Sequence, residues 1–371
     1  MENEINILSR EEKLKLELRS IYESHGFKKA NVNKFEPYDL YVDNKSFLNT
    51  DKIISFMDLD GRVLSLKPDV TLSIVKKMPD EKLKGFMKVY YDEKVVRLPF
   101  GSHEYKEISQ TGIEILGEID AYAKVEAVFL ALRSLNAIGE PFVLDISHMG
   151  FVSGLLDECD ITDEEKKTLN SFIFSKNTHE LESELKKLNI PENLKKSIET
   201  IPLLYGPFES TLERAKSLAL GETSLNALKE LENLYNSVKF NSLSKNISLD
   251  FSIVNDIDYY NGIIFQGYIK GLSKIVLKGG NYDFLTKKMG KQSGAIGFAV
   301  YTDELSRLLY EKKNFDCDII LLYDDKTEFS YIYKIARDLI LEDNFSIRIE
   351  REIPDNITAA KILDLRENKD A

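Results

Sequence analysis

The sequence FSIVNDIDYYNGIIFQGYIKGLSKIVLKGGNYDFL, residues 251–285, carries the strongest structural signal in the chain. Its β-branched and aromatic residues predict two strands, and Asn261-Gly262 is a hairpin-turn signal between apolar runs. Gly279-Gly280 permits a close approach of the backbone to a ligand or to another chain, because glycine has no Cβ. Asp258-Tyr259-Tyr260 places a carboxylate beside two phenols. Two interpretations stay open: strands that close over a small-molecule pocket, or a core strand pair with exposed tyrosines.

The composition is that of a globular protein. The chain has 371 residues, of which 43% are hydrophobic and 30% charged, enough for one large domain with small modules. No apolar run approaches the ~20 residues of a membrane span, and the acidic N-terminus resembles neither a signal nor a transit peptide. Cys159 and Cys317 predict neither a disulfide framework nor a zinc site, so we expect a cytoplasmic protein. The net charge of −12 argues against tRNA as a partner.

Residues 53–77 predict a hairpin followed by a helix. Asp60-Gly61 lies between alternating segments, which is the pattern of a tight turn. The following run, Lys67-Pro68-Asp69-Val70-Thr71, is typical of a helix N-terminus, where proline fits and free N–H groups favour oxygen acceptors. A helix cap is therefore one role for Asp69 and Thr71.

Apolar periodicity predicts most of the remaining elements. We expect helices at residues 10–25 and 120–138, two strands joined by a loop at 86–117, and a strand at 142–150. Residues 161–238, rich in Lys, Glu and Leu, predict a helical insertion with capping boxes at Thr162 and Ser210. The tail predicts a strand at 317–323, a helix at 329–341, a strand at 345–350 and then a short helix. His148 is interpreted as structural, because no metal-ligating cluster accompanies it.

Gln110, Gly112 and Glu114 alternate within the second predicted strand of the 86–117 segment, so they share one face. Two hydrogen-bonding side chains that flank a glycine can face a ligand. The alternative is a polar outer face of the sheet.

Together these motifs resemble the class II histidyl-tRNA synthetases. The matching runs are residues 255–261 and 279–283 (histidine signature), 67–71 (R-P-E-x-T), 86–117 (motif 2), which contains 110–114 (Q-x-G-V-E), 294–305 (motif 3) and, more weakly, 25–44 (the homodimer-forming motif 1). The resemblance implies an α+β fold, with a class II synthetase-like antiparallel sheet flanked by helices over residues 1–315. It also implies that 161–238 is a helical insertion within that domain and that 316–371 is a truncated C-terminal α/β module.

The resemblance implies a histidine site. In that family the Glu and Thr of R-P-E-x-T hold the α-amino group, and the Gln and Glu of Q-x-G-V-E line the histidine pocket. Tyr and Glu side chains can hydrogen-bond the imidazole nitrogens. The expected histidine-binding residues here are Asp69, Thr71, Gln110, Glu114, Asn255, Tyr259 and Tyr260. Neither a metal nor another cofactor is expected.

The sequence departs from the synthetase pattern where ATP would be bound. The catalytic arginine of the histidine signature falls on Asn255, and the motif 3 arginine falls on Glu304, whose carboxylate would repel a triphosphate. Arg97 is either the motif 2 arginine on a shortened loop or an exposed strand-end residue. No replacement cation is expected near Glu304. We therefore expect a retained histidine site, a damaged ATP site and no catalytic residue.

This combination resembles the regulatory subunits of ATP phosphoribosyltransferase, the HisZ family. The resemblance implies a non-catalytic homodimer that joins the short-form catalytic subunit in a hetero-octamer. The chain would activate that subunit and make it sensitive to the effector L-histidine at the first step of histidine biosynthesis. Two alternatives stay open: a divergent histidine–tRNA ligase, and a synthetase-like module that senses an amino acid or uncharged tRNA.

Overall fold

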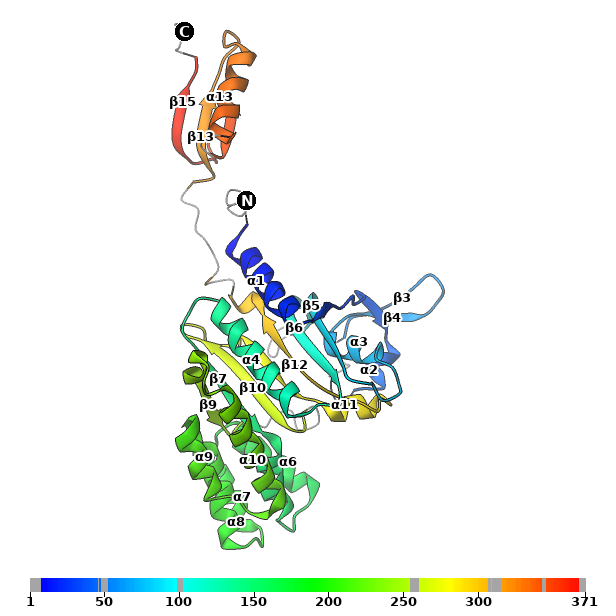
Figure 1. Cartoon of the computed structure of the whole chain (residues 1–371). Helices are drawn as coiled ribbons and strands as arrows, with labels where there is room; N and C mark the ends of the chain where they lie inside the picture. The colour runs from blue at the N-terminus through cyan, green and yellow to red at the C-terminus, as the bar shows by residue number, and fades with distance from the viewer. Residues whose placement is uncertain are drawn as a thin grey trace. The chain divides into compact units, whose positions relative to one another are not determined.

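The computed structural model describes residues 8–45, 47, 53–98, 103–253, 260–305, 308, 315–341 and 345–366. The chain forms two compact units, of which the larger lies within Leu14–Arg307 and the smaller within Met1–Lys13 and Leu308–Ala371 (Figure 1). Among the described residues, no helix has the length and apolar character needed to cross a membrane.

A nine-stranded sheet forms the centre of the larger unit, in the order β1-β5-β6-β12-β11-β10-β7-β9-β8. Its neighbours are antiparallel except for the pairs β1/β5 and β7/β9. The strands are β1 (Lys28–Lys29), β5 (Phe86–Arg97), β6 (Lys106–Gly117), β7 (Phe142–His148), β8 (Tyr205–Pro207), β9 (Ile247–Asp250), β10 (Ile263–Ile269), β11 (Leu277–Asn281) and β12 (Gly294–Tyr301). The predicted strand–loop–strand at residues 86–117 is thus confirmed as the long β5–β6 pair.

The two strands predicted within residues 251–285 are β10 and β11, and they are antiparallel neighbours. At Gly279 the close neighbour is a strand of the same chain, since a Cβ there would lie 2.4 Å from the Gly297 carbonyl oxygen. The hairpin turn predicted at Asn261-Gly262 is wrong. The preceding strand, β9, pairs with β7 and β8, while the backbone N–H of Asn261 donates to Asn281 at the end of β11 at 3.1 Å.

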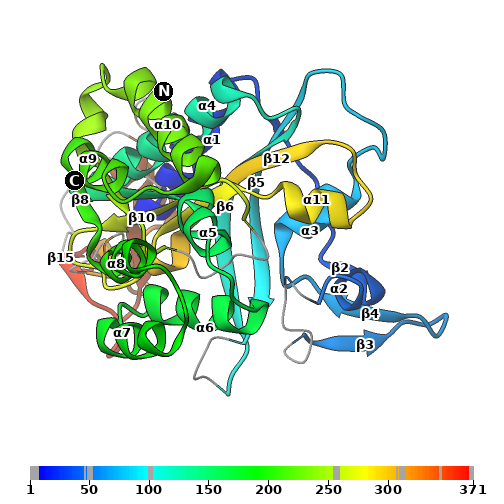
Figure 2. The same cartoon turned by 90° about the horizontal axis from the view of Figure 1, so that it is seen from below.

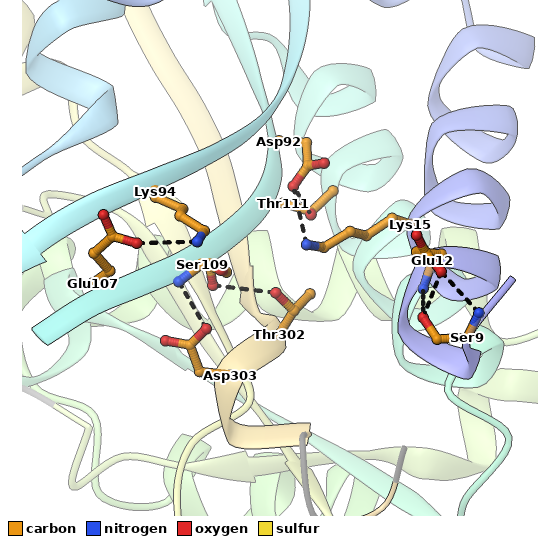
Figure 3. Close-up of polar contacts among 10 residues, drawn as sticks. All are labelled: Ser9, Glu12, Lys15, Asp92, Lys94, Glu107, Ser109, Thr111, Thr302 and Asp303. Carbon is orange, nitrogen blue, oxygen red and sulfur yellow. Dashed lines mark hydrogen bonds and ion pairs between the residues drawn. The ribbon is translucent and has the colours of Figure 1, made fainter. Parts of the chain in front are cut away.

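Helices α1 (Arg10–Ser24) and α4 (Ala121–Ala137) confirm the two predicted amphipathic helices. Ser9 and Glu12 exchange hydrogen bonds at the start of α1 (Figure 3). The buried hydroxyls of Tyr22 on α1 and Ser134 on α4 lie 2.9 Å apart. Tyr22 also packs edge-on against Phe298 of β12, with 6.1 Å between ring centroids. Both helices therefore cover the same face of the sheet.

The segment predicted as a helical insertion is mainly helical, although β8 within it joins the edge of the large sheet. Thr162 forms the predicted capping box with Glu165. The second predicted box is wrong, because Ser210 lies inside α9 and donates to the Pro207 carbonyl at 3.1 Å. The described helices of this region are α6 (Asp163–Phe174), α7 (Thr178–Lys187), α8 (Glu192–Thr200), η3 (Ile201–Leu203), α9 (Phe208–Lys216) and α10 (Gly221–Val238), with α5 (Met149–Asp157) before it and η4 (Ser242–Asn246) after it.

A small antiparallel sheet, β2-β4-β3, lies beside the large one. It contains β2 (Phe35–Pro37), β3 (Ser55–Met57) and β4 (Val63–Leu66), and α2 (Asp39–Val42) follows β2. The predicted turn at Asp60-Gly61 is confirmed, with Gly61 at φ +79°. In Figure 2 the β3–β4 hairpin extends away from the large sheet. Helix α3 (Val70–Lys76) follows β4, and α11 (Asp283–Lys288) follows β11.

The smaller unit contains a parallel three-stranded sheet, β14-β13-β15, and one described helix, α13. The elements are β13 (Cys317–Leu322), α13 (Phe329–Leu341), β14 (Ile347–Glu350) and β15 (Ala359–Asp364). The first three match the predictions for the tail. The short terminal helix is wrong, since these residues form β15 on the second edge of β13.

Candidate functional site

The candidate site lies on one face of β5, β6, β12 and β11. Glu114 on β6 is opposite Gly297 on β12, which is in turn opposite Gly280 on β11. A Cβ on Gly297 would lie 1.7 Å from Oε2 of Glu114. Glycine at this position therefore leaves room for the carboxyl group above the sheet.

Figure 3 shows the opposite face of the same strands. Lys15 of α1 lies 3.9 Å from the Asp92 carboxylate, which accepts a hydrogen bond from Thr111 at 3.1 Å. Side chains alternate along a strand, so Gln110 and Glu114 face away from α1. The site and the helices α1 and α4 thus lie on different faces of the sheet.

Glu114 is the buried centre of the site, with 2% of its surface exposed. Thr71 Oγ1 donates to its Oε1 at 2.9 Å, and the Tyr282 hydroxyl donates to Oε2 at 2.5 Å. Burial raises the pKa of Glu114 to about 8, even though both hydrogen bonds lower it. Near neutral pH this carboxyl can therefore exist with or without a proton. Such a group suits an imidazole ring, which has one nitrogen that donates and one that accepts.

Asp69 caps α3, as predicted, because its Oδ1 accepts from the backbone N–H of Leu72 at 2.9 Å. Its Oδ2 accepts from Arg97 Nη2 at 3.0 Å, and Arg97 Nε donates to the Pro68 carbonyl at 2.6 Å. Arg97 is therefore an ion-pair partner of Asp69 rather than an unattached strand-end residue.

The structure brings Asp69, Thr71 and Glu114 together. Gln110 is 3% exposed and lies on the same face of β6 as Glu114, with Gly112 between them on the strand. Tyr260 is 9% exposed and lies over Gly280, where a Cβ would be 2.8 Å from its ring. Asn255 and Tyr259 lie outside the described residues.

The structure places two further tyrosines at the site, Tyr282 and Tyr91, which were not expected there from the sequence. Tyr282 belongs to the run 279–283, so its motif was a usable signal. Tyr91 is fully buried, and burial together with the charges of Glu114 and Asp69 raises its pKa well above the usual value. Nothing in the sequence distinguishes Tyr91 from an ordinary core aromatic residue.

The position expected to correspond to the motif 3 arginine is in η5 (Thr302–Leu305). Asp303 accepts from the backbone N–H of Ser109 at 2.9 Å, which attaches η5 to β6 (Figure 3). Glu304 accepts from Lys274 at 2.7 Å. The expectation that no cation lies near Glu304 is therefore wrong, although the charge of Lys274 is matched by Glu304 itself.

A separate cavity of about 270 Å³ lies between α4 and α10. On its wall, Glu230 accepts from Lys124 at 2.7 Å and lies 3.5 Å from His148 Nε2. Burial acts to raise the pKa of Glu230, but His148 and Lys124 lower it to about 2. His148 also caps α5 by accepting from Gly150 at 3.0 Å, which agrees with its structural interpretation.

The described residues contain no group of three or more His, Cys, Asp or Glu able to hold a metal.

Comparison with known sequences shows which proteins this chain is similar to. Residues 6–305 match the sequence model for histidyl-tRNA synthetases. The ATP phosphoribosyltransferase regulatory subunit of Oceanobacillus iheyensis is 31% identical over 295 residues, which cover 79% of this chain and 72% of that protein. The protein of the same name from Clostridium kluyveri is 30% identical over 339 residues, covering 87% and 84%.

Solved structures share this fold. An ATP phosphoribosyltransferase regulatory subunit/histidyl-tRNA synthetase from Bacillus halodurans matches with a TM-score of 0.79 at 22% identity, over 97% of this chain and 94% of that one. Histidyl-tRNA synthetase from Nostoc matches with a TM-score of 0.73 at 18% identity, over 94% and 85%. A HisG:HisZ complex from Thermotoga maritima matches with a TM-score of 0.61 at 20% identity, over 78% and 96%. These matches confirm the predicted synthetase-like α+β fold.

Proposed function

The chain belongs to the family of ATP phosphoribosyltransferase regulatory subunits, and we propose that it activates a short-form catalytic subunit and makes that subunit sensitive to L-histidine. The protein in the Thermotoga maritima complex has this fold and is found with a HisG partner, which supports a hetero-oligomer. The proposed place of action is the first step of histidine biosynthesis, in the cytoplasm. Histidine would inhibit by linkage, because it would bind the inhibited arrangement of the complex more tightly than the active one.

The observation that carries the proposal is the buried Glu114, which Thr71 and Tyr282 hold at 2.9 and 2.5 Å. Their hydroxyls fix the carboxyl in position, and its raised pKa lets it serve as acceptor or donor toward an imidazole. Asp69, whose charge acts on Glu114, provides a carboxylate for an α-ammonium group. We propose that Gln110 and Tyr260 complete this histidine site with Asn255 and Tyr259.

We propose further that the chain does not form an adenylate. Arg97 is bound to Asp69, Glu304 occupies the position of the motif 3 arginine, and Asn255 occupies that of the signature arginine. Loss of one preorganised donor typically raises a barrier by ~2.7–4 kcal/mol, so several losses remove useful turnover. Asn255→Arg alone should therefore give no histidine-dependent pyrophosphate exchange, because Glu304 remains. Measurable exchange in that variant would contradict the proposal.

For assembly, we propose a homodimer that joins the catalytic subunit in a hetero-octamer. The small sheet supports the homodimer, because Glu36 and Ser65 on one face are buried while Phe35 and Phe56 on the other are 51% and 39% exposed. An apolar face of this kind is typical of a protein interface. We also propose the domain division at 315/316, with residues 316–371 as a truncated module.

The deciding experiment measures phosphoribosyltransferase activity of the short-form catalytic subunit from the same genome, alone, with this chain, and with this chain plus L-histidine. We expect activation on mixing and its reversal by histidine. Absence of both activation and complex formation would refute the proposed function.

Pyrophosphate exchange and tRNA binding would then separate the two alternatives. A divergent histidine–tRNA ligase would show histidine-dependent exchange and specific tRNA binding. A sensing module of another pathway would bind an amino acid or uncharged tRNA without exchange.

A further inference from the structure

An ion pair beside Glu114 has the form of a receptor for an amino-acid main chain. Arg97 donates through Nη2 to Asp69 and through Nε to the Pro68 carbonyl. A guanidinium has five N–H groups, and no described residue accepts from the other three. The side chain of Arg97 is 33% exposed and that of Asp69 is 13% exposed, so a ligand can reach both.

We propose that Arg97 binds the α-carboxylate of the ligand while Asp69, still paired with it, binds the α-ammonium. The inference rests on the proposed histidine site and assigns the partner of the ligand's carboxylate. A zwitterion carries two opposite charges a few ångströms apart, as the ion pair does, so each charge can lie against its opposite. The site and ligand remain neutral together, and no unpaired charge is buried.

Asp69 has room for this second partner. Its Oδ1 accepts from Leu72 and its Oδ2 from Arg97, while a carboxylate offers about four acceptor positions. The ammonium therefore does not have to displace Arg97. Displacement would instead leave the guanidinium without its counter-ion, which is costly in a half-buried position.

Two other lysines, Lys67 after β4 and Lys278 on β11, are less well placed. Lys67 is buried and paired with Glu93 at 2.7 Å. Lys278 on β11 lies 5.9 Å from the centre of the Tyr260 ring, and β11 is separated from β5 by β12 and β6. The ammonium and carboxylate of an amino acid share one carbon atom, so the carboxylate must lie near the partner of the ammonium. Arg97 contacts that partner directly.

The test compares L-histidine with two analogues that each lack one of its main-chain charges. L-histidinol has no carboxylate, and imidazole propionate has no ammonium. Calorimetry would measure the binding of all three ligands to the full chain and to R97Q. We expect R97Q to bind L-histidine about 10- to 100-fold more weakly and L-histidinol no more weakly than the unmodified chain. D69N should lose affinity for both amines but not for imidazole propionate.

R97K and K278Q serve as matched controls, and thermal unfolding checks that each variant is folded. R97K keeps the charge and should recover part of the histidine affinity. Three results would overturn the assignment. R97Q could bind histidine more tightly than the unmodified chain, or it could lose the same affinity for histidine as for histidinol. K278Q, instead of R97Q, could lose affinity only for ligands that carry a carboxylate. If the unmodified chain binds neither amine, the proposed function fails with it. If it binds a different zwitterionic amino acid in an Arg97-dependent manner, the proposed ligand is wrong and the ion-pair assignment stands.

Discussion

The hydroxyl of Tyr282 donates to Oε2 of Glu114 at 2.5 Å, across 168 residues of sequence. Both side chains are only 2% exposed. Thr71 of α3 donates to the other oxygen of the same carboxyl group. Residues from α3, β6 and the start of α11 thus converge on one buried acid, and their hydrogen bonds fix its orientation before any ligand is present.

Removing the carboxyl should weaken histidine binding without disrupting assembly. Glu114→Ala leaves Thr71, Tyr282 and the imidazole of the ligand without their shared partner. Unpaired buried groups cost ~1–3 kcal/mol, so we expect an equivalent loss of affinity. Calorimetry with L-histidine measures the loss, and sedimentation measures the complex with the catalytic subunit.

Glu126→Ala is the matched control for this change. Glu126 is also buried, at 6% exposed, but its carboxyl pairs with Lys88 on the other face of the sheet. Histidine affinity in this variant should stay close to that of the unmodified chain. Unchanged affinity in Glu114→Ala would mean that the pocket lies elsewhere.

Tyr282→Phe should lower histidine affinity about 5- to 30-fold, because the Glu114 carboxyl loses a donor and is less firmly oriented. Tyr268→Phe removes a comparable hydrogen bond, from Tyr268 to Gln266 at 2.8 Å on β10. Calorimetry on the two variants separates a role in the pocket from a general loss of packing. Equal effects of the two substitutions would remove Tyr282 from the site.

Glu114 should make folding stability depend on pH. Burial raises its pKa from the ordinary 4.5 to about 8, so between these values the folded chain keeps a proton that the unfolded chain loses. The contribution of the protonated Glu114 carboxyl to stability is complete below the pKa of the unfolded chain. Above that pH the free energy of unfolding falls by up to ~1.4 kcal/mol per pH unit, until the pH reaches the pKa of Glu114 in the folded chain.

Urea unfolding of the chain and of Glu114→Gln between these two pKa values measures this contribution. Glutamine does not titrate, so the unmodified chain should lose stability relative to the variant as the pH rises. A difference in unfolding free energy that does not change with pH would show that Glu114 titrates normally in the folded chain.

The sequence predicted elements whose signal is local. The Asp60-Gly61 hairpin, the cap of α3 at Asp69 and the alternation of Gln110 and Glu114 depend on neighbouring residues, and the structure has each of them. The resemblance to a known family located Thr71 and Glu114 at one site. Neither source gives the distance between side chains.

The predictions failed where long-range pairing overrides a local signal. Ala359–Asp364 contains residues that favour helices, such as alanine and leucine, but the free edge of β13 recruits it as β15. The Asn261-Gly262 turn signal is overridden because β10 pairs with β7 and β11 instead of β9. The Arg97–Asp69 contact also joins separate elements, so no periodicity in the sequence indicates it.

The outer face of the small sheet should hold the proposed homodimer together. Phe35 and Phe56 pack edge-on there, with 5.3 Å between ring centroids, and both remain exposed in the single chain. Phe56→Asp places a charge on this face, and a buried unpaired charge strongly destabilises an interface. Sedimentation velocity over a range of concentrations should therefore show a shift from dimer to monomer.

The adjacent substitution, Met57→Asp, provides a closely matched control. Met57 is on the same strand and is 69% exposed, but alternation directs its side chain to the opposite face. Both variants add one negative charge to β3, so a general electrostatic effect would appear in both. Dissociation in Phe56→Asp alone would locate the dimer interface on the Phe35 face. A dimer that survives Phe56→Asp would show that the two copies meet through another surface.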